Sequence, residues 1–175
     1  GSVTEDASLS VTGAIVFADI DVTDVNTLSV TSADGNATVQ AISDNADGSA
    51  RDNSVSVIVA GRYGSLKLLG DGTWEYTLNN AHAAVQGLGV GETLAENFAV
   101  SYSDATGSAG SAINITINGS NDLPTLTGDS GAVTEDTTLT ATGAIVFADI
   151  DVTDVNSLSV TSADCNATVH SISDN

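Results

Sequence analysis

The sequence contains a second version of its own beginning. Residues 3–45, here the opening segment, align without a gap to residues 133–175, the repeated segment, and 35 of 43 positions are identical. The offset is a whole-domain length, far longer than the period of a solenoid protein. We therefore expect a tandem repeat, with a complete domain at 3–122, a linker at 123–132, and the N-terminal part of the next domain at 133–175.

The residue types between the expected turns favour an all-β fold. Val, Ile and Thr dominate these stretches, and β-branched residues favour strands. Apolar residues make up 41% of the chain and aromatic residues only 4%, so we expect a core of mainly aliphatic side chains. Short alternating segments separated by Gly, Asp, Asn and Ser are typical of an antiparallel β-sandwich with about seven strands.

A hairpin gives the strongest local signal. Gly70-Asp71-Gly72 lies between two alternating runs, and glycine supplies the positive φ that tight hairpin turns need. On the second arm, Trp74 is expected to face the core. Ala81–Leu88 predicts a short helical turn, and Ser43–Ser54 a polar loop. The expected strands are Ala7–Val11, Ala14–Phe17, Thr27–Ala33, Ala37–Ile42, Val55–Ala60, Tyr63–Leu69, Thr73–Leu78, Glu92–Tyr102 and Ser111–Asn118.

The repeated segment carries only the opening strands of a domain. A few strands cannot bury two faces, so this segment cannot close a sandwich by itself. Residues 46–175 nevertheless hold one full set of strands in permuted order, so the two segments can compete for one body. Two arrangements stay open: 3–122 fold together with the repeated segment loosely held, or strands are exchanged between molecules.

The charge balance excludes several kinds of partner. The chain has 23 acidic and 3 basic residues, a formal net charge of −20. Nucleic acid needs a basic footprint, and an anionic membrane surface repels such a chain. No apolar run approaches the ~20 residues of a membrane span, so we expect no membrane insertion. The single cysteine, Cys165, matches Gly35 in the opening segment and is expected to have no role.

The acidic residues gather at the ends of expected strands, in both segments. Calcium takes six to eight oxygen ligands from carboxylates, Asn and backbone carbonyls, and without a cation such neighbours repel. The D-x-D of Asp19 and Asp21 is expected to aim both side chains the same way. A solvated acidic rim without metal is the alternative. The candidate Ca²⁺ ligands are Glu5, Asp6, Asp19, Asp21, Asp24, Asp104, Asn121, Asp122, Glu135, Asp136, Asp149, Asp151 and Asp154.

Five stretches together resemble a known family. They are VTED, TGAIVFADIDVTD, YGSLKLLGDGTWEYTLNN, AVQGLGVGETLAENFAVSYSD and AINITINGSNDLP, and they cover nearly the whole repeat. In this order they resemble the VCBS and cadherin-like extender domains of large RTX-type bacterial adhesins, which are secreted by the type I route. The resemblance implies an immunoglobulin-like sandwich, calcium at domain junctions, and a rigid stalk that holds a ligand-binding tip away from the cell.

The resemblance also assigns ligands to particular sites. It implies one complete junction site formed by Glu135, Asp149 and Asp151 with Asp104, Asn121 and Asp122. It implies a partial site, facing an upstream domain, formed by Glu5, Asp19 and Asp21. The chain departs from the family at Asp104-Ala105, where Asp-Gly is usual, and at 43–54, which looks like an insertion. In that loop Asp44, Asp47 and Asp52 either hold another ion or belong to a mobile segment.

These observations predict a structural protein and not an enzyme. His82 is the only histidine of the complete repeat, and no nucleophile–base pair can be defended. We expect an extracellular extender repeat of a bacterial cell-surface adhesin, ordered by calcium, contacting neighbouring repeats and serving adhesion and biofilm formation. The alternative is a binding module for a surface carbohydrate or for another molecule of the same chain, with Trp74, Tyr76 or Tyr63 exposed as a sugar platform.

Overall fold

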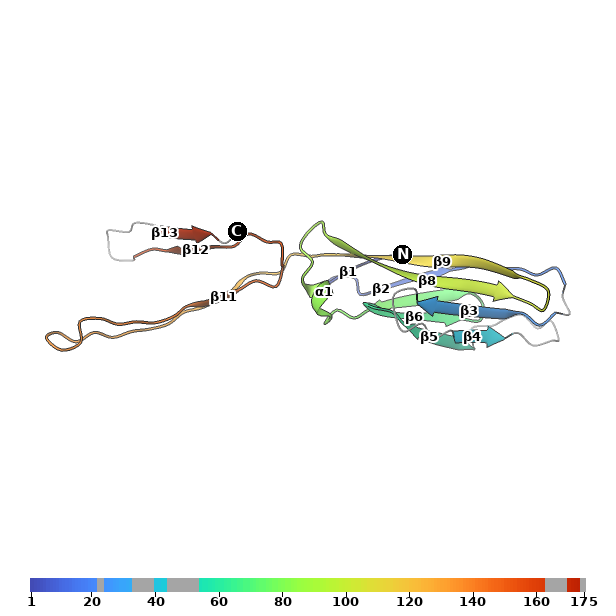
Figure 1. Ribbon diagram of the computed structural model, residues 1–175, viewed down its shortest axis with the longest axis horizontal. Helices are drawn as coiled ribbons and strands as arrows, with labels where there is room; N and C mark the ends of the chain where they lie inside the picture. The colour runs from blue at the N-terminus through green and yellow to red at the C-terminus, as the bar shows by residue number, and fades with distance from the viewer. Residues whose placement is uncertain (22–23, 33–39, 44–53, 163–169, 174–175) are drawn as a thin grey trace. The chain divides into compact units, whose positions relative to one another are not determined.

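The chain separates into two compact units. The computed structural model describes residues 1–21, 24–32, 40–43, 54–162 and 170–173. The first unit is Gly1–Ser120 and the second is Asn121–Asn175. In Figure 1 the first unit runs from blue to yellow and the second from orange to red. Most of the expected loop at 43–54 and half of the expected strand at 37–42 lie outside the described residues.

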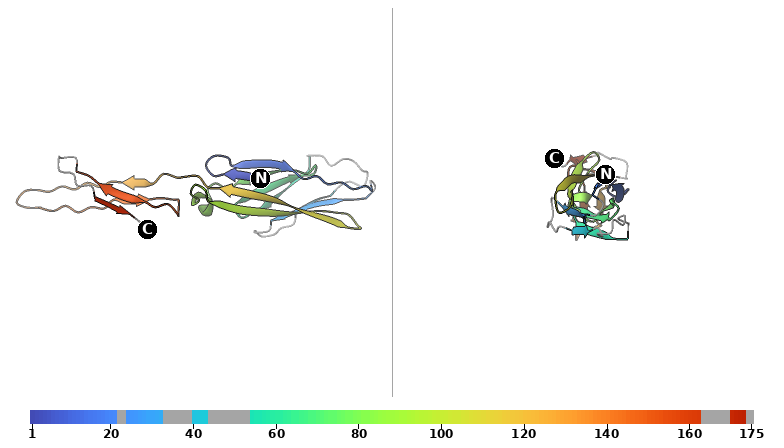
Figure 2. Two further views of the ribbon diagram at one scale, coloured as in Figure 1. Left: turned by 90° about the horizontal axis from the view of Figure 1, so that it is seen from above. Right: turned by 90° about the vertical axis from the view of Figure 1, so that its right-hand side faces the viewer.

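The described part of the first unit is an all-β sandwich of two sheets (Figures 1 and 2). All pairs are antiparallel except β1 with β9, which run parallel. The five-stranded sheet has the order β1 (Ser2–Thr4), β9 (Ser108–Asn118), β8 (Thr93–Ser103), β3 (Thr27–Ser32) and β4 (Gln40–Ser43). The four-stranded sheet has the order β2 (Ser10–Ala14), β7 (Thr73–Leu78), β6 (Gly64–Leu69) and β5 (Ser56–Ala60).

The core lies between the two sheets and follows from the alternation of the sequence. Along β7 the residues alternate between exposed and buried, as the two-residue period of a strand requires. Trp74 is 8% exposed, which confirms its expected place in the core. The close approach of this side chain explains Gly13 on the adjacent strand β2. A Cβ atom there would lie 2.3 Å from the indole ring.

The predicted hairpin and helical turn are both present. The hairpin joins β6 to β7, and Gly72 adopts a φ of 87°. The Asp71 carboxylate accepts a hydrogen bond from Thr73 N at 2.9 Å, which closes the turn. The helix α1 spans Ala83–Gln86, and the Nδ1 atom of His82 caps it by accepting from Ala84 N at 3.2 Å. Among the described residues, no helix has the length and hydropathy of a membrane span.

The start of the chain differs from expectation. A strand, β1, precedes Glu5, because residues 2–4 pair with residues 116–118 of β9. The two strands expected within 7–17 are replaced by the single strand β2, which ends at Ala14 where its partner β7 begins. This early end matters for the site, because the acidic residues from Asp19 onward follow an irregular segment and not a strand.

The second unit has two small sheets among its described residues. β10 (Thr125–Thr127) pairs with β11 (Val146–Ala148), and β12 (Ser157–Val160) pairs with β13 (His170–Ser173). Residues 123–132, expected to be a linker, therefore contain a strand. Two-stranded sheets are marginal by themselves, and many apolar side chains of this unit are exposed, as expected for a segment that cannot close a sandwich.

Candidate metal centre

Three carboxylates meet at one end of the first unit. Single carboxylate oxygens of Asp19, Asp24 and Asp104 all lie within 4.8 Å of one another, and the three residues are partly buried. Asp19 and Asp24 belong to the irregular segment after β2, and Asp104 follows the last residue of β8. Three like charges at this spacing repel one another unless protons or a cation balance them. The cluster could therefore hold a metal ion.

A compact turn presents the first two carboxylates. Asp21 N donates to Asp19 Oδ1 at 2.9 Å, and Asp24 N donates to the carbonyl of Asp21 at 3.0 Å. The buried Asn26 donates from Nδ2 to the carbonyl of Asp24 at 3.4 Å. Asp21 itself is exposed and lies outside the cluster. The expectation that a D-x-D aims both side chains together was wrong here, because the segment is a turn and lacks the alternation of a strand.

A second turn fixes the third carboxylate. Asp104 Oδ1 accepts from Thr106 N at 2.6 Å, from Thr106 Oγ1 at 2.9 Å and from Gly107 N at 2.6 Å. The backbone hydrogen bonds from Thr106 and Gly107 hold the pKa of Asp104 below its usual value. The group is therefore ionised at neutral pH. Beside it lies a shallow depression of about 190 Å³, lined in part by Asp19, Asn26 and Tyr102.

Asp104 does not lie where the junction prediction placed it. In the β8–β9 ladder Ser103 is opposite Ser108, whereas Thr93 is opposite Asn118. Each strand residue advances the chain by about 3.3 Å, so Asp104 is separated from Ser120 by the length of an eleven-residue strand. Its carboxylate neighbours are Asp19 and Asp24 of the same unit, and the prediction that grouped it with Asn121 and Asp122 is corrected accordingly.

Glu5 lies at the other end of the first unit. Its backbone N donates to the carbonyl of Asn118 at 3.1 Å, and its Oε1 accepts from Ser120 N at 3.0 Å. The side chain is fully buried. Glu5 and Asp19, which were expected on one face, are thus at opposite ends, because β1 delivers Glu5 to the C-terminal end of β9.

Asp6 has a local structural role. Its φ of 55° is in the left-handed region, where Asp is among the few tolerated residues. Its carboxylate accepts from Asn80 Nδ2 at 2.6 Å, and its backbone N donates to Asn80 Oδ1 at 3.0 Å. This pair ties the turn after β1 to the segment after β7, and it leaves Asp6 outside the carboxylate cluster.

In the second unit a second acidic group forms. Asp122 N donates to Asp151 Oδ2 at 2.8 Å, and Asp151 N donates to Asp149 Oδ1 at 3.2 Å. Asp151 is 2% exposed, and its Oδ1 accepts no hydrogen bond from any residue that the structure describes. Asn121 donates from Nδ2 to the carbonyl of Asp122. Hydrogen bonds thus join Asp122, Asp151 and Asp149, and Asn121 is the sequence neighbour of Asp122. These are four of the six residues predicted to form the junction site.

The remaining candidates of the second unit are exposed. Glu135 and Asp136 lie in a turn closed by the bridge between Thr134 and Thr138, and Asp136 has a φ of 61°. Asp154 donates from its backbone N to the carbonyl of Asp151 at 3.2 Å, with an exposed side chain. None of these three side chains belongs to a carboxylate group of three among the described residues.

Sequence reasoning missed a buried carboxylate on β8. Glu96 is fully buried; its Oε2 accepts from Tyr76 OH at 2.6 Å, and its Oε1 accepts from Tyr63 N at 3.1 Å and from Arg62 N. Burial, with the hydrogen bond and charge of Glu96, raises the pKa of Tyr76 above its usual value. The network pins the turn after β5 to the opposite sheet. The only sequence signal is a Glu at an inward position of an alternating strand.

The aromatic residues of the carbohydrate alternative are in the core. Trp74, Tyr76 and Tyr63 are 8%, 0% and 6% exposed, so none of them forms a surface platform. No protein-family model matches the chain, and no curated protein matches it.

Proposed function

We propose that this chain is a calcium-stabilised extender repeat of a bacterial cell-surface adhesin, with a structural and not a catalytic role. The observation that carries the proposal is the approach of Asp19, Asp24 and Asp104 to within 4.8 Å. This approach is costly for three ionised groups, and a divalent cation between them removes the cost. The resemblance of the sequence to secreted adhesin repeats supports an extracellular location, where calcium is plentiful.

The chemistry of the ligands favours calcium. Carboxylate oxygens bind hard cations, whereas transition metals prefer sites with His or Cys. No described His or Cys belongs to the cluster. Mg²⁺ demands near-octahedral geometry, and Ca²⁺ accepts six to eight oxygens in flexible arrangements. Because the three residues are only partly buried, water can fill the remaining positions around a calcium ion.

The two segments suggest how a site is completed in an array. Asp149, Asp151 and Asp154 are the counterparts of Asp19, Asp21 and Asp24, and the same backbone hydrogen bonds shape both turns. In the second unit, Asp122 of the incoming chain binds Asp151. We propose that a full site combines this contact with the approach of an Asp104-type carboxylate to the turn, as seen in the first unit. The incoming chain, the acidic turn and the end of β8 then hold one cluster of ions.

The path of the chain suits an extender. β1 runs parallel to its neighbour β9, so the chain enters the first unit in the direction in which it leaves. Any residues before Gly1 would extend toward the end that holds Asp104, and the chain departs after Ser120 at the other end. We propose that ions bound at the entry end of each unit stiffen an array of such units.

Calcium removal is the direct test. We expect calcium to raise the melting temperature of the stripped protein by several degrees, because a ligand at roughly 100 times its Kd stabilises by about 2.7 kcal/mol. Asp24→Asn should abolish most of this increase. Asp154→Asn is the matched control, because it makes the same change in the same local sequence, and the exposed Asp154 belongs to no group of three carboxylates among the described residues.

An unchanged melting temperature after calcium removal would contradict the proposal. If the melting temperature with excess chelator equals that with saturating calcium, the carboxylates tolerate one another without a metal. Equal losses in the Asp24→Asn and Asp154→Asn proteins would indicate a diffuse effect of net charge and not a site. Magnesium at the same concentration should give a smaller increase than calcium.

A further inference from the structure

The β12–β13 hairpin duplicates the β3–β4 hairpin. Leu28 is opposite Ile42 in β3–β4, and Leu158 is opposite Ile172 in β12–β13. All the other Cα pairs of the two hairpins follow the same register. The second hairpin therefore has the strand pairing of the first without the sheet that surrounds the first.

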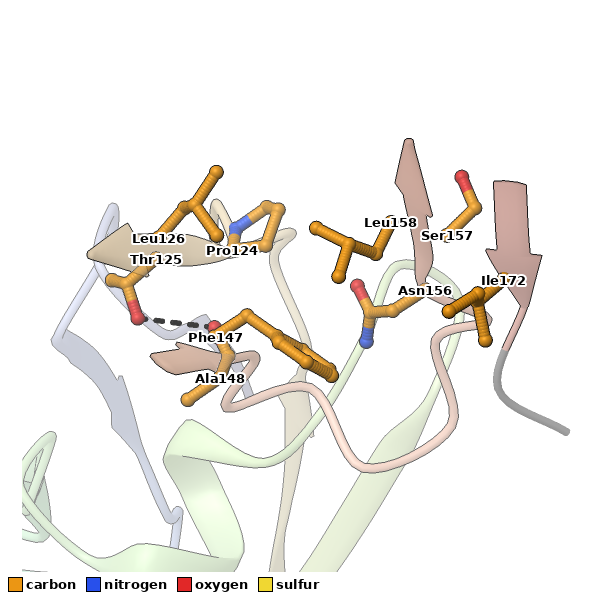
Figure 3. A pocket seen from close by; sticks show the side chains of 9 residues that line it. All are labelled: Pro124, Thr125, Leu126, Phe147, Ala148, Asn156, Ser157, Leu158 and Ile172. Atoms are coloured by element: carbon orange, nitrogen blue, oxygen red, sulfur yellow. Dashed lines mark hydrogen bonds between the residues drawn. The ribbon is translucent and has the colours of Figure 1, made fainter. Parts of the chain in front are cut away.

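The two hairpins differ in what covers their apolar side chains. Val30 and Ile42 are 0% and 4% exposed, whereas their counterparts Val160 and Ile172 are 63% and 72% exposed. Figure 3 shows apolar side chains of the second unit, Ile172 among them, around a hollow. The hollow has a volume of about 400 Å³, and its apolar lining includes Pro124, Leu126, Phe147, Leu158 and Ile172.

The first unit shows which strand edge such a hairpin joins. β3 pairs with β8, where Leu28 is opposite Tyr102 and Val30 is opposite Val100. Among the described residues, β3 of the same molecule occupies that edge of β8. A β8 edge that receives β12 in the same way must therefore become available on a molecule whose own β3 has left it.

The repeated segment keeps the residues that fit this edge. The strand positions at which the hairpins differ are Thr27, Gln40 and Ala41, which Ser157, His170 and Ser171 replace. None of the three positions is buried in the first unit. The apolar residues that β3–β4 places in the core have identical counterparts in β12–β13, so the β8 edge cannot distinguish the two hairpins by these side chains.

We propose that β12–β13 binds the β8 edge of a second molecule of this chain, in the place of that molecule's β3–β4. The partner is thus another copy of the same protein, and the contact is an exchange of strands. Each exchange releases one hairpin as it binds another, so the number of covered hairpins is unchanged. Association then depends on protein concentration and becomes strongly favourable where β3–β4 cannot occupy the edge.

A disulfide test reads the register directly. Ser29 is opposite Ser101 on the outer side of the sheet, so Ser159, its counterpart, should lie opposite Ser101 of the second molecule. One chain carries Ser101→Cys and the other Ser159→Cys, both with Cys165→Ser. Cross-strand neighbours are close enough for a disulfide. We expect a linked heterodimer whose yield rises with protein concentration.

The control shifts the cysteine by two residues. Ser157→Cys is expected opposite Ser103, so its link to Ser101→Cys spans a diagonal of roughly 7–8 Å and should form much less. Equal yields from Ser157→Cys and Ser159→Cys would overturn the proposal, because two molecules would then meet without this register. A link that forms within a doubly substituted chain but not between two chains would overturn it as well.

A binding experiment asks the same question without crosslinking. A chain with Leu28→Glu and Leu158→Glu has no usable hairpin of its own, so its β8 edge is left for a donor. We expect it to form a one-to-one complex with the unmodified chain in light scattering, and no complex with the Leu158→Glu chain. If both partners bind equally, the hairpin is not the donor. Should the double variant not fold, the disulfide test still decides.

Discussion

The opening and repeated segments have nearly the same sequence and share two turns and one hairpin, but their other strands and their surroundings differ. The turn at Asp19–Asp24 and its counterpart at Asp149–Asp154 are closed by equivalent hydrogen bonds. The turns after Val3 and Val133 each contain an Asp with a φ near 60°, at Asp6 and Asp136. Local sequence is therefore sufficient for turns and hairpins in this protein.

The segments diverge where structure needs a distant partner. Ser10–Ala14 forms β2 because β7 lies beside it, whereas the matching residues 140–144 form no strand. Val30 is fully buried and Val160 is 63% exposed. The difference shows that the opening segment needs the strands that follow it in order to form β2 and to bury Val30.

The largest expected effect concerns the core. Leu28→Ala should lower the free energy of unfolding of the first unit by about 2–5 kcal/mol, because the leucine is fully buried and its removal leaves a cavity. Leu158→Ala should lower this free energy of unfolding by less than about 1 kcal/mol, because no second sheet covers Leu158 among the described residues. Chemical denaturation at low protein concentration measures both. Similar losses would mean that the two hairpins are equally buried in solution.

A smaller effect is expected for the middle residue of each acidic turn. Asp151 is 2% exposed beside Asp122, whereas Asp21 is exposed and outside the cluster. Asp151→Asn should weaken calcium binding to the second unit by about tenfold, equivalent to 1.4 kcal/mol. Asp21→Asn should leave binding to the first unit nearly unchanged. Calcium titrations followed by amide NMR separate the two sites, and the reverse order of effects would contradict this assignment.

The smallest effect concerns acid. Backbone hydrogen bonds lower the pKa of Asp104 in the first unit and of Asp129 in the second. A lowered pKa stabilises the fold at pH above the unfolded value of about 3.9, and this stabilisation is lost as pH falls through the folded value. Asp104→Asn should reduce the loss of first-unit stability as the pH falls, and Asp129→Asn should leave that loss unchanged. An unchanged acid limb in the Asp104→Asn protein would show that the hydrogen bonds have little effect.

Much of the first unit could be predicted from the sequence, because its signals are local. Glycines at 70 and 72 marked the hairpin, and alternation along 73–78 placed Trp74 in the core. The partner of Asp104 could not be predicted in this way. Its neighbours Asp19 and Asp24 are brought to it by the pairing of distant strands, and the residues between them and β2 carry no regular period.

Two other features could not be predicted from the sequence, for the same reason. β1 is only three residues long and forms because β9 offers it an edge more than 100 residues later. In the sequence, Glu96 cannot be told apart from an exposed polar residue. Its carboxylate is buried because Tyr76 of β7 and the turn at 61–63 donate hydrogen bonds to it. In both cases the information lies in tertiary contacts and not in neighbouring residues.

The parallel pairing of β1 with β9 has a mechanical consequence. A force that pulls Gly1 and Ser120 apart draws β1 and β9 in opposite directions along their common axis. The hydrogen bonds between them are then loaded in shear and must break together, whereas a hairpin pulled at its open end unzips one bond at a time. The short β1–β9 ladder therefore resists a force applied along the chain between the two ends of the first unit.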